Sequence, residues 1–331
     1  MNYIGSKYSL LAFLERTTDD VTGGNAAGGV FADLFAGTGV VGGAFKRKGC
    51  TVIANDIQHY AYTLNRHYVE NVPPMTSERL EWFNSLSGED GFVYQNYCAG
   101  SGSGRNYFTD ENGRKCDAIR NALNNLLSTG EIGYDEHYYY LAGLINSIDK
   151  VANTASVYGA YLKHIKSSAA KPFKLELLPL VEGVRGKAYC LNINNIIRKI
   201  KGDILYLDPP YNARQYCSNY HVLETISRSD NPILSGVTGL RNSGGQKSAF
   251  CSKRTVESAF DDVIANADFK YIFLSYNNEG LMSLDTIRSI MERYGKYEQF
   301  TQDYHRFRAD KEEARNHKAD STVEYLHVLI K

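Results

Sequence analysis

A buried strand that ends on a carboxylate and two prolines is the feature that most constrains this fold. The segment from Asp203 to Tyr211 reads DILYLDPPY, and its apolar run is typical of a strand covered on both faces. Proline has no N–H for a strand ladder and fixes φ at about −65°, so the strand ends at Asp208 and continues as a rigid turn. The Asp208 carboxylate, the Pro209 carbonyl and the Tyr211 ring are therefore predicted at the carboxyl edge of a sheet, where open α/β sheets bind ligands. Taken alone, the segment fits an ordinary Pro-Pro turn equally well.

A glycine-rich turn upstream gives a second ligand-binding pattern. Residues 30–42 read VFADLFAGTGVVG, the order of a strand, a glycine turn and a helix start. Gly37, Gly39 and Gly42 satisfy G-x-G-x-x-G. Glycines let the backbone pass close to a ligand, and the N-terminus of the next helix favours polar or anionic groups.

A second strand over residues 50–54 ends at Asn55 and Asp56. Asp56 lies 19 positions after Gly37, a spacing at which a carboxylate can accept both ribose hydroxyls of an adenosine-bearing cofactor. By itself this motif would also suit a nicotinamide enzyme.

Three separated motifs make the chain resemble the Dam-like DNA adenine-N6 methyltransferases. An N-terminal NYIGSK over residues 2–7, the FAGTG loop over 35–39 and DPPY over 208–211 occur in the order of that family. The resemblance runs from about residue 2 to the C-terminus and is weakest across 75–186, where relatives differ in the DNA sequence that they read. Tyr3 departs from relatives such as Dam itself, which carry tryptophan there, but an aromatic ring is kept.

The resemblance implies an α/β fold with a doubly wound, mostly parallel, Rossmann-like methyltransferase sheet and a C-terminal β-hairpin. It also implies that residues 1–74 and 187–331 form the catalytic domain, which binds S-adenosyl-L-methionine, with an inserted, mainly helical target-recognition domain over 75–186. The residue pattern agrees, because strand–helix alternation is interrupted by helices predicted over 117–129 and 135–150 and then resumes. Strands are predicted over 30–35, 50–54, 188–191, 204–207, 271–275, 299–305 and 323–330.

The activity implied is site-specific methyl transfer from S-adenosyl-L-methionine to adenine N6 in duplex DNA, with base flipping. The N6 lone pair is delocalised into the ring, and two acceptors gripping its hydrogens, Asp208 and the Pro209 carbonyl, would make it available and stabilise the developing positive charge. Tyr211 would stack on the flipped adenine, and neither a metal ion nor a covalent enzyme intermediate is required. The implied catalytic residues are Asp208, Pro209, Pro210 and Tyr211, and the implied cofactor-binding residues are Tyr3, Gly5, Lys7, Asp33, Phe35, Gly37, Gly39, Asp56 and Asp208.

Related chemistries can be weighed from the same residues. Cytosine-C5 methylation uses a Pro-Cys nucleophile in relatives, and none of the seven prolines precedes a cysteine. Cytosine-N4 methylation is the first alternative, because cytosine-N4 enzymes resemble this chain. They usually carry Ser in place of Asp208, so Asp208 favours adenine. A non-catalytic nucleic-acid-binding protein of the same fold is the second alternative.

The charge distribution favours a DNA partner although the formal net charge is zero. Polyanion binding depends on where the basic residues lie. The runs 163–174 and 241–254 contain lysine or arginine and no acid, and a third basic run begins at Arg306. One such run is usually a solvated surface, whereas three in a chain of this family favour a DNA cleft. The candidate DNA-binding residues are Lys163, Lys166, Arg241, Lys247, Lys253, Arg254, Arg306 and Arg308.

The remaining expectations concern compartment and partners. The six cysteines are scattered and never form C-x-x-C, which favours reduced thiols in a cytoplasmic protein without a zinc site. No signal peptide or membrane span is expected. The resemblance implies a monomer that acts on double-stranded DNA in a restriction-modification or phage DNA-modification system, and it leaves open a cognate restriction endonuclease as a partner.

Overall fold

The chain folds into two compact units, each assembled from separate segments. The computed structural model describes residues 3, 5–24, 26–305 and 321–331. We call the first the helical unit; it comprises Met1–Gly5, Gln58–Val181 and Tyr216–Gly245. The second, the sheet unit, comprises Ser6–Ile57, Glu182–Gln215 and Gln246–Lys331.

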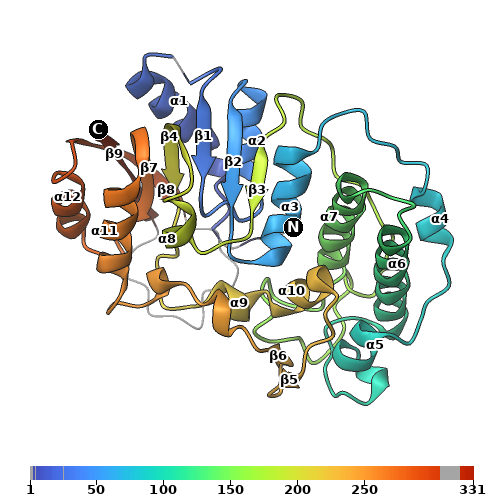
Figure 1. Cartoon of the computed structure of the whole chain (residues 1–331). Coiled ribbons are helices and arrows are strands. Elements are labelled where there is room, and N and C mark those ends of the chain that lie inside the picture. The colour runs from blue at the N-terminus through green and yellow to red at the C-terminus, as the bar shows by residue number, and fades with distance from the viewer. Residues whose placement is uncertain (1–2, 4, 25, 306–320) are drawn as a thin grey trace. The chain divides into compact units, whose positions relative to one another are not determined.

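The sheet unit is built on a seven-stranded sheet in the order β3-β2-β1-β4-β7-β9-β8 (Figure 1). The first five strands in this order are parallel, whereas β9 runs antiparallel to both β7 and β8. The predicted mostly parallel sheet with a C-terminal hairpin is therefore confirmed. The candidate DNA-binding residues Arg306 and Arg308, between the two predicted hairpin strands, lie outside the described residues. The strands are β1 (Val30–Asp33), β2 (Thr51–Asn55), β3 (Lys187–Tyr189), β4 (Lys201–Leu207), β7 (Asp268–Asn277), β8 (Lys296–His305) and β9 (Ser321–Ile330).

Side chains alternate between the two faces of this sheet, as strand geometry requires. Ala32 of β1 and Leu205 of β4 share a buried cluster with Ile193, Phe260 and Ile287 from three helices. Phe31, the neighbour of Ala32, instead stacks on Phe45 of α2 with ring centroids 3.7 Å apart. The helices of this unit are η1 (Tyr8–Leu10), α1 (Leu11–Thr22), α2 (Val40–Arg47), α8 (Ile193–Ile196), η5 (Ala249–Cys251), α11 (Val256–Asn266) and α12 (Leu284–Met291), and η4 (Gly244–Gln246) crosses the division between the units.

The strand order creates a switch point between β1 and β4. From β1 the chain continues to β2 and β3 on one side, whereas β4 and β7 lie on the other. Loops leaving the carboxyl ends of two such strands diverge and open a ligand-binding crevice. The register pairs Asp33 with Tyr206, so the ends of β1 and β4 lie side by side at the switch point.

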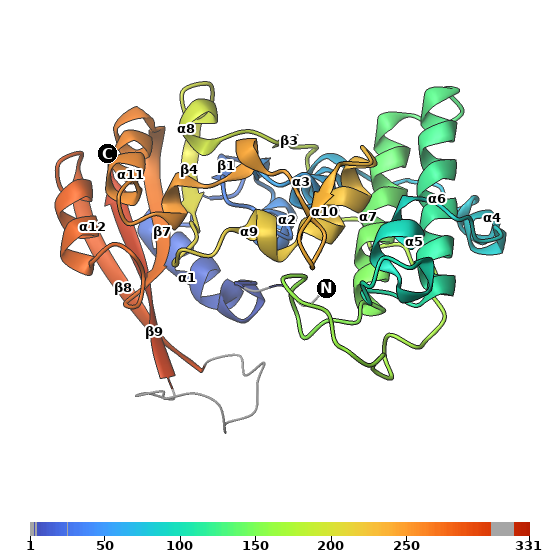
Figure 2. The same ribbon diagram turned by 90° about the horizontal axis from the view of Figure 1, so that it is seen from below.

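The helical unit has a core rich in tyrosine. Helices α6 and α7 pack against each other (Figure 2), and fully buried tyrosines such as Tyr97, Tyr140 and Tyr220 belong to one cluster. None of the helices in the described ranges combines the length and apolar character needed to cross a membrane. The elements of this unit are α3 (His59–Asn65), η2 (Arg66–Glu70), α4 (Leu80–Ser85), α5 (Phe92–Tyr97), η3 (Ala99–Ser101), α6 (Asp110–Ser128), α7 (Tyr134–Lys150), α9 (Tyr216–Asn219), α10 (His221–Arg228), β5 (Leu234–Ser235) and β6 (Leu240–Arg241).

The compact units do not follow the domain limits predicted from the sequence. Helix α3 and η2, expected in the catalytic domain, pack on α7 within the helical unit, and α10 packs on α3. The cause is burial: Tyr60 on α3 is fully buried against Tyr220. Compactness does not identify the residues that read DNA, so the target-recognition role of 75–186 stays a prediction.

Candidate active site

The glycine loop and the second acidic strand end meet at the carboxyl edge of the sheet unit. Gly37 and Gly39 have φ values of 49° and 78°, which glycine adopts without steric cost. Gly39 is the N-cap of α2. The Gly37 N–H donates to Asp56 Oδ2 over 3.0 Å, and the Ala36 N–H donates to the Asn55 carbonyl over 3.0 Å. The glycine loop and Asp56 at the end of β2 therefore form one loop cluster.

Phe35 and Asp33 lie at the carboxyl end of β1, on the same side of the switch point. The Phe35 ring packs edge-on against Phe250, with centroids 5.0 Å apart. Asp33 is buried, and its Oδ1 has no hydrogen-bond partner among the residues that the structure describes. Burial, followed by the negative charges of Asp208 and Asp56, raises the pKa of Asp33 well above its usual value. A buried carboxyl oxygen of this kind is open to a donor or a cation.

The DPPY turn holds Asp208 in a cluster of four polar side chains. The Lys7 ammonium lies 3.2 Å from Asp208 Oδ1 and 2.6 Å from Glu324 Oε1. The Tyr211 hydroxyl lies 2.8 Å from each of those two oxygens and accepts a hydrogen bond from Lys7. We call Lys7, Asp208, Tyr211 and Glu324 the carboxylate cluster.

Burial and charge act in opposite directions on the carboxylate cluster. Burial raises the pKa of Asp208 to about 6; Lys7 opposes the shift and Glu324 adds to it. Burial would lower the pKa of Lys7, but Asp208 and Glu324 outweigh it and raise that pKa above its ordinary value. Lys7 is therefore positively charged at neutral pH, and Asp208 keeps its proton to a higher pH than an exposed aspartate does.

Glu324 is the member of the cluster that sequence reasoning missed. Along β9, Glu324 shares the buried parity of Leu326 and Val328. A charged residue at a buried position of an apolar strand has to be paired, and this was the available signal. Because β9 is antiparallel to β7, the beginning of β9 lies at the carboxyl edge of the parallel strands, with Glu324 opposite Asn277.

Tyr211 was expected to stack on adenine, and the structure places it within the carboxylate cluster. Its ring lies under the Lys7 ammonium, 4.9 Å from the centroid, and packs edge-on against Tyr276. The stacking role stays a prediction.

Tyr3 and Gly5, two other residues implied for the cofactor, belong to the helical unit. The Tyr3 ring stacks on Tyr220, with centroids 4.9 Å apart, and its hydroxyl lies 3.3 Å from that of Tyr60. Gly5 has a φ of +84°, and a Cβ there would lie 3.0 Å from the Tyr216 hydroxyl. Their roles toward a cofactor also stay predictions.

Comparison with known proteins gives the family. The model of the D12 class N6 adenine-specific DNA methyltransferases matches residues 3–290. The chain belongs to this family. It is 51% identical over 334 residues to the type II methyltransferase M.NlaIII of Neisseria lactamica, covering 100% of this chain and 99% of the relative.

Two further relatives differ in how much of their own length the match covers. The type II methyltransferase M.CviAII of Paramecium bursaria Chlorella virus 1 is 33% identical, with 93% of each chain covered. M.FokI of Planomicrobium okeanokoites is 39% identical, but the match covers 89% of this chain and 47% of that protein. The prediction of a DNA adenine-N6 methyltransferase that uses S-adenosyl-L-methionine is thereby confirmed.

The exposed basic residues of this D12 methyltransferase are distributed over both units. Lys247, Lys253 and Arg254 are exposed in the sheet unit. Lys163 is exposed in the helical unit, whereas Lys166 is half-buried and donates to the Thr154 carbonyl over 2.6 Å.

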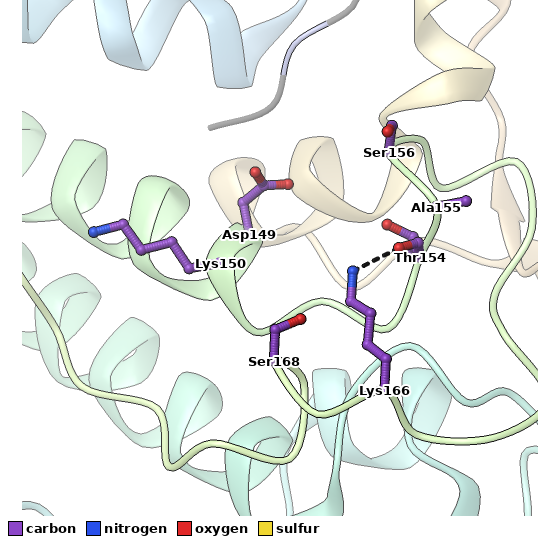
Figure 3. A pocket seen from close by; sticks show the side chains of 7 residues that line it. All are labelled: Asp149, Lys150, Thr154, Ala155, Ser156, Lys166 and Ser168. Atoms are coloured by element: carbon purple, nitrogen blue, oxygen red, sulfur yellow. Dashed lines mark hydrogen bonds between the residues drawn. The ribbon is translucent and has the colours of Figure 1, made fainter. Parts of the chain in front are cut away.

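Lys166 lines a polar pocket in the helical unit (Figure 3). The pocket has a volume of about 370 Å³, and Thr154, Ser156 and Ser168 contribute hydroxyl groups. Asp149 lines it as well. An anion in this pocket would meet the Asp149 carboxylate, so the pocket by itself does not indicate a phosphate site.

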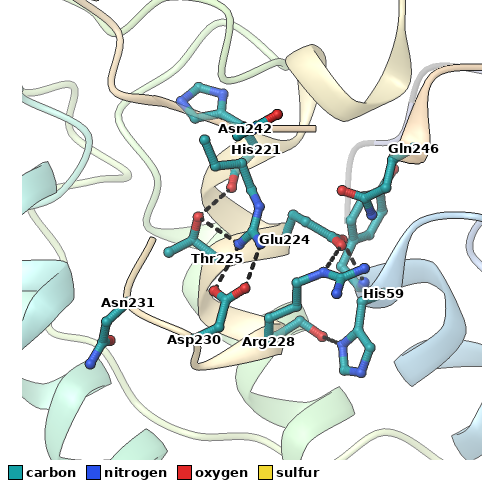
Figure 4. A network of polar contacts seen from close by, with 12 residues as sticks. His59, His221, Glu224, Thr225, Arg228, Asp230, Asn231, Asn242 and Gln246 are labelled. Atoms are coloured by element: carbon teal, nitrogen blue, oxygen red, sulfur yellow. Dashed lines mark hydrogen bonds and ion pairs between the residues drawn. The ribbon is translucent and has the colours of Figure 1, made fainter. Parts of the chain in front are cut away.

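Arg241, which the basic run 241–254 made a candidate for DNA binding, has a structural role. The side chain is buried and pairs with both oxygens of Asp230, at 3.0 and 2.6 Å, and its Nη1 lies 3.4 Å from the Thr225 hydroxyl. Asp230 and Thr225 lie next to a second ion pair, between Glu224 and Arg228 (Figure 4). A guanidinium committed in this way is not available to DNA phosphates, so we exclude Arg241 from the candidate DNA-binding residues.

Proposed function

We propose that this chain methylates adenine N6 at a specific site in duplex DNA, with Asp208 and the Pro209 carbonyl as the two acceptors for the adenine amine. The observation that carries the proposal is the buried Asp208 carboxylate, held through Oδ1 by Lys7 and Tyr211 at the carboxyl end of β4. Pro209 and Pro210 fix the backbone that follows. An acceptor in a fixed position stabilises the positive charge that develops on the nitrogen without reorganising in the transition state.

The residues present fit the cofactor. S-adenosyl-L-methionine supplies an activated methyl on a sulfonium, together with an ammonium group and an adenosine. Asp208 and Asp56 both disfavour the ionised form of Asp33, so a cationic ligand beside Asp33 relieves this repulsion. Gly37 and Gly39 allow the backbone to approach the ligand closely, and Phe35 offers an apolar face.

Asp56→Ala is expected to raise the dissociation constant of S-adenosylmethionine about 10- to 100-fold, because a charged acceptor of the ribose hydroxyls is removed. The dissociation constant for DNA should stay unchanged. Calorimetric titration of each ligand measures both, with the exposed Asp20→Ala as the matched control. Unchanged cofactor affinity in Asp56→Ala would remove Asp56 from the site.

The basic residues Lys247, Lys253 and Arg254 are proposed to bind DNA phosphates. Their joint replacement by Gln should weaken DNA binding and flatten its dependence on log salt by about 0.9 for each phosphate that the protein no longer neutralises. Cofactor affinity should not change. Fluorescence anisotropy at several salt concentrations measures the slope.

A matched triple variant tests whether position, rather than net charge, matters. Lys199, Lys201 and Lys270 are exposed and lie near the amino ends of β4 and β7, at the edge opposite the carboxylate cluster. Their replacement by Gln should leave the slope unchanged. Equal slopes for the two triple variants would show that the run from Lys247 to Arg254 is only a solvated surface.

The names of two relatives support a proposal for the cellular setting. M.NlaIII and M.CviAII are named type II methyltransferases, and we propose the same kind of system here, with a cognate restriction endonuclease that cleaves the unmethylated sequence. We also propose a cytoplasmic enzyme that acts as a monomer on duplex DNA. Residues 75–186 are proposed to read the target sequence.

A further inference from the structure

We propose that Glu324 is a positioning residue for methyl transfer. From β9 it holds the Lys7 ammonium and the Tyr211 hydroxyl so that they fix Oδ1 of Asp208 and leave Oδ2 to the adenine amine. This inference rests on the proposed role of Asp208 as an acceptor.

The position of Glu324 on β9 brings its carboxylate into contact with both Lys7 and Tyr211. Its side chain is 6% exposed and that of Lys7 is 7% exposed, so the pair is shielded from water. In a shielded site, ion pairs and hydrogen bonds fix geometry more strongly than at the surface.

The count of donors shows why Glu324 matters. A lysine ammonium has three hydrogens, and Lys7 has three partners in the cluster: Glu324, Asp208 and the Tyr211 oxygen. Tyr211 has one hydrogen and lies 2.8 Å from both carboxylates, so it can donate to only one of them at a time. In the part of the chain that the structure describes, the Asp208 side chain makes its ion pair and its hydrogen bond through Oδ1.

The charge of Glu324 also sets the balance of the cluster. Two carboxylates and one ammonium leave one net negative charge, which favours an amine that becomes positive as the methyl arrives. Without the Glu324 charge, the Lys7 ammonium would balance Asp208 alone and the cluster would be neutral. Asp208 would then be a weaker acceptor for the adenine amine.

The charges around Asp208 determine how methyl transfer depends on pH. The charged and titratable groups that act on Asp208 or are acted on by it are Lys7, Glu324, Tyr211, Asp33 and Tyr206. Among the effects on Asp208, Glu324 raises its pKa and Lys7 lowers it. Removing the Glu324 charge therefore lowers the pKa of Asp208, and the acid limb of kcat/KM moves to lower pH.

The test compares Glu324→Gln with Glu298→Gln on the neighbouring strand β8. Glu298 pairs with Lys296 outside the carboxylate cluster, so its replacement makes the same chemical change elsewhere. Glu324→Gln is expected to lower the plateau of kcat about 10- to 100-fold and to move the acid limb down by about one pH unit. KM for DNA should stay within about threefold of wild type. Glu298→Gln should match the wild type in all three quantities.

Further variants separate the possible outcomes. Glu324→Asp keeps the charge but withdraws it by one methylene, and it should shift the acid limb in the same direction by less; this tests the inference even if Glu324→Gln does not fold. A wild-type acid limb in either folded Glu324 variant would overturn the inference, as would a fall in activity accompanied only by a lower Tm. Asp208→Ala is measured in parallel: full activity there would overturn the proposed site itself, whereas an inactive Asp208→Ala beside an unaffected Glu324→Gln would overturn only the role of Glu324.

Discussion

Asp208→Ala is expected to lower kcat for adenine methylation about 100- to 1,000-fold, because the variant lacks the charged acceptor that stabilises the methylated amine. The fold should survive, since Lys7 keeps Glu324 and Tyr211 as partners. Single-turnover transfer of labelled methyl groups measures the effect, and thermal unfolding checks the fold. Asp268→Ala, at the exposed beginning of β7, is the control and should retain wild-type turnover. Near wild-type turnover in Asp208→Ala would contradict the assignment.

Lys7→Met is expected to change both activity and stability, because it leaves two buried carboxylates without their cation. The free energy of unfolding near neutral pH should fall by about 3–5 kcal/mol, the usual cost of breaking a buried pair from one side. Lys48→Met is the control: Lys48 pairs with Asp19 at a partly exposed site, and its removal should cost less than about 1 kcal/mol. Denaturant unfolding measures both values.

The pH dependence of Lys7→Met gives the sharper result. Lys7 lowers the pKa of Asp208, so its removal raises that pKa above about 6 and moves the acid limb of activity to higher pH. Asp208 in the folded variant then holds its proton more tightly than in the unfolded chain, so the loss of stability grows as the pH rises through the folded-state pKa. The shift is opposite in sign to the shift expected for Glu324→Gln. An acid limb at the wild-type position would show that Lys7 does not set the charge of Asp208.

Local patterns predicted the elements that bear the site. The apolar run before Asp208 and the glycines after Asp33 specify strand ends and a tight turn within a few residues. The switch point between β1 and β4 then follows from strand order. These parts of the fold are encoded in short segments, and the structure has them where the sequence predicted them.

Contacts across long stretches of sequence could not be predicted in this way. Lys7 and Glu324 are 317 positions apart, and only the antiparallel return of β9 brings them together. Arg241 lies in an acid-free run, but its partner Asp230 is 11 positions upstream of it, outside that run. Helix α3 lies within residues 1–74, which the resemblance assigns to the catalytic domain, whereas its Tyr60 is buried within the helical unit.

One measurement tests the central claim most directly. The wild-type protein is incubated with methyl-labelled S-adenosylmethionine and double-stranded DNA, the DNA is digested to nucleosides, and the labelled nucleoside is identified. A parallel sample is sequenced by a method that detects N6-methyladenine. The proposed function predicts label in N6-methyl-2′-deoxyadenosine, N6-methyladenine at one recurring sequence context, and at most a trace of label with Asp208→Ala. Label on cytosine N4, or unlabelled DNA despite bound cofactor, would contradict it.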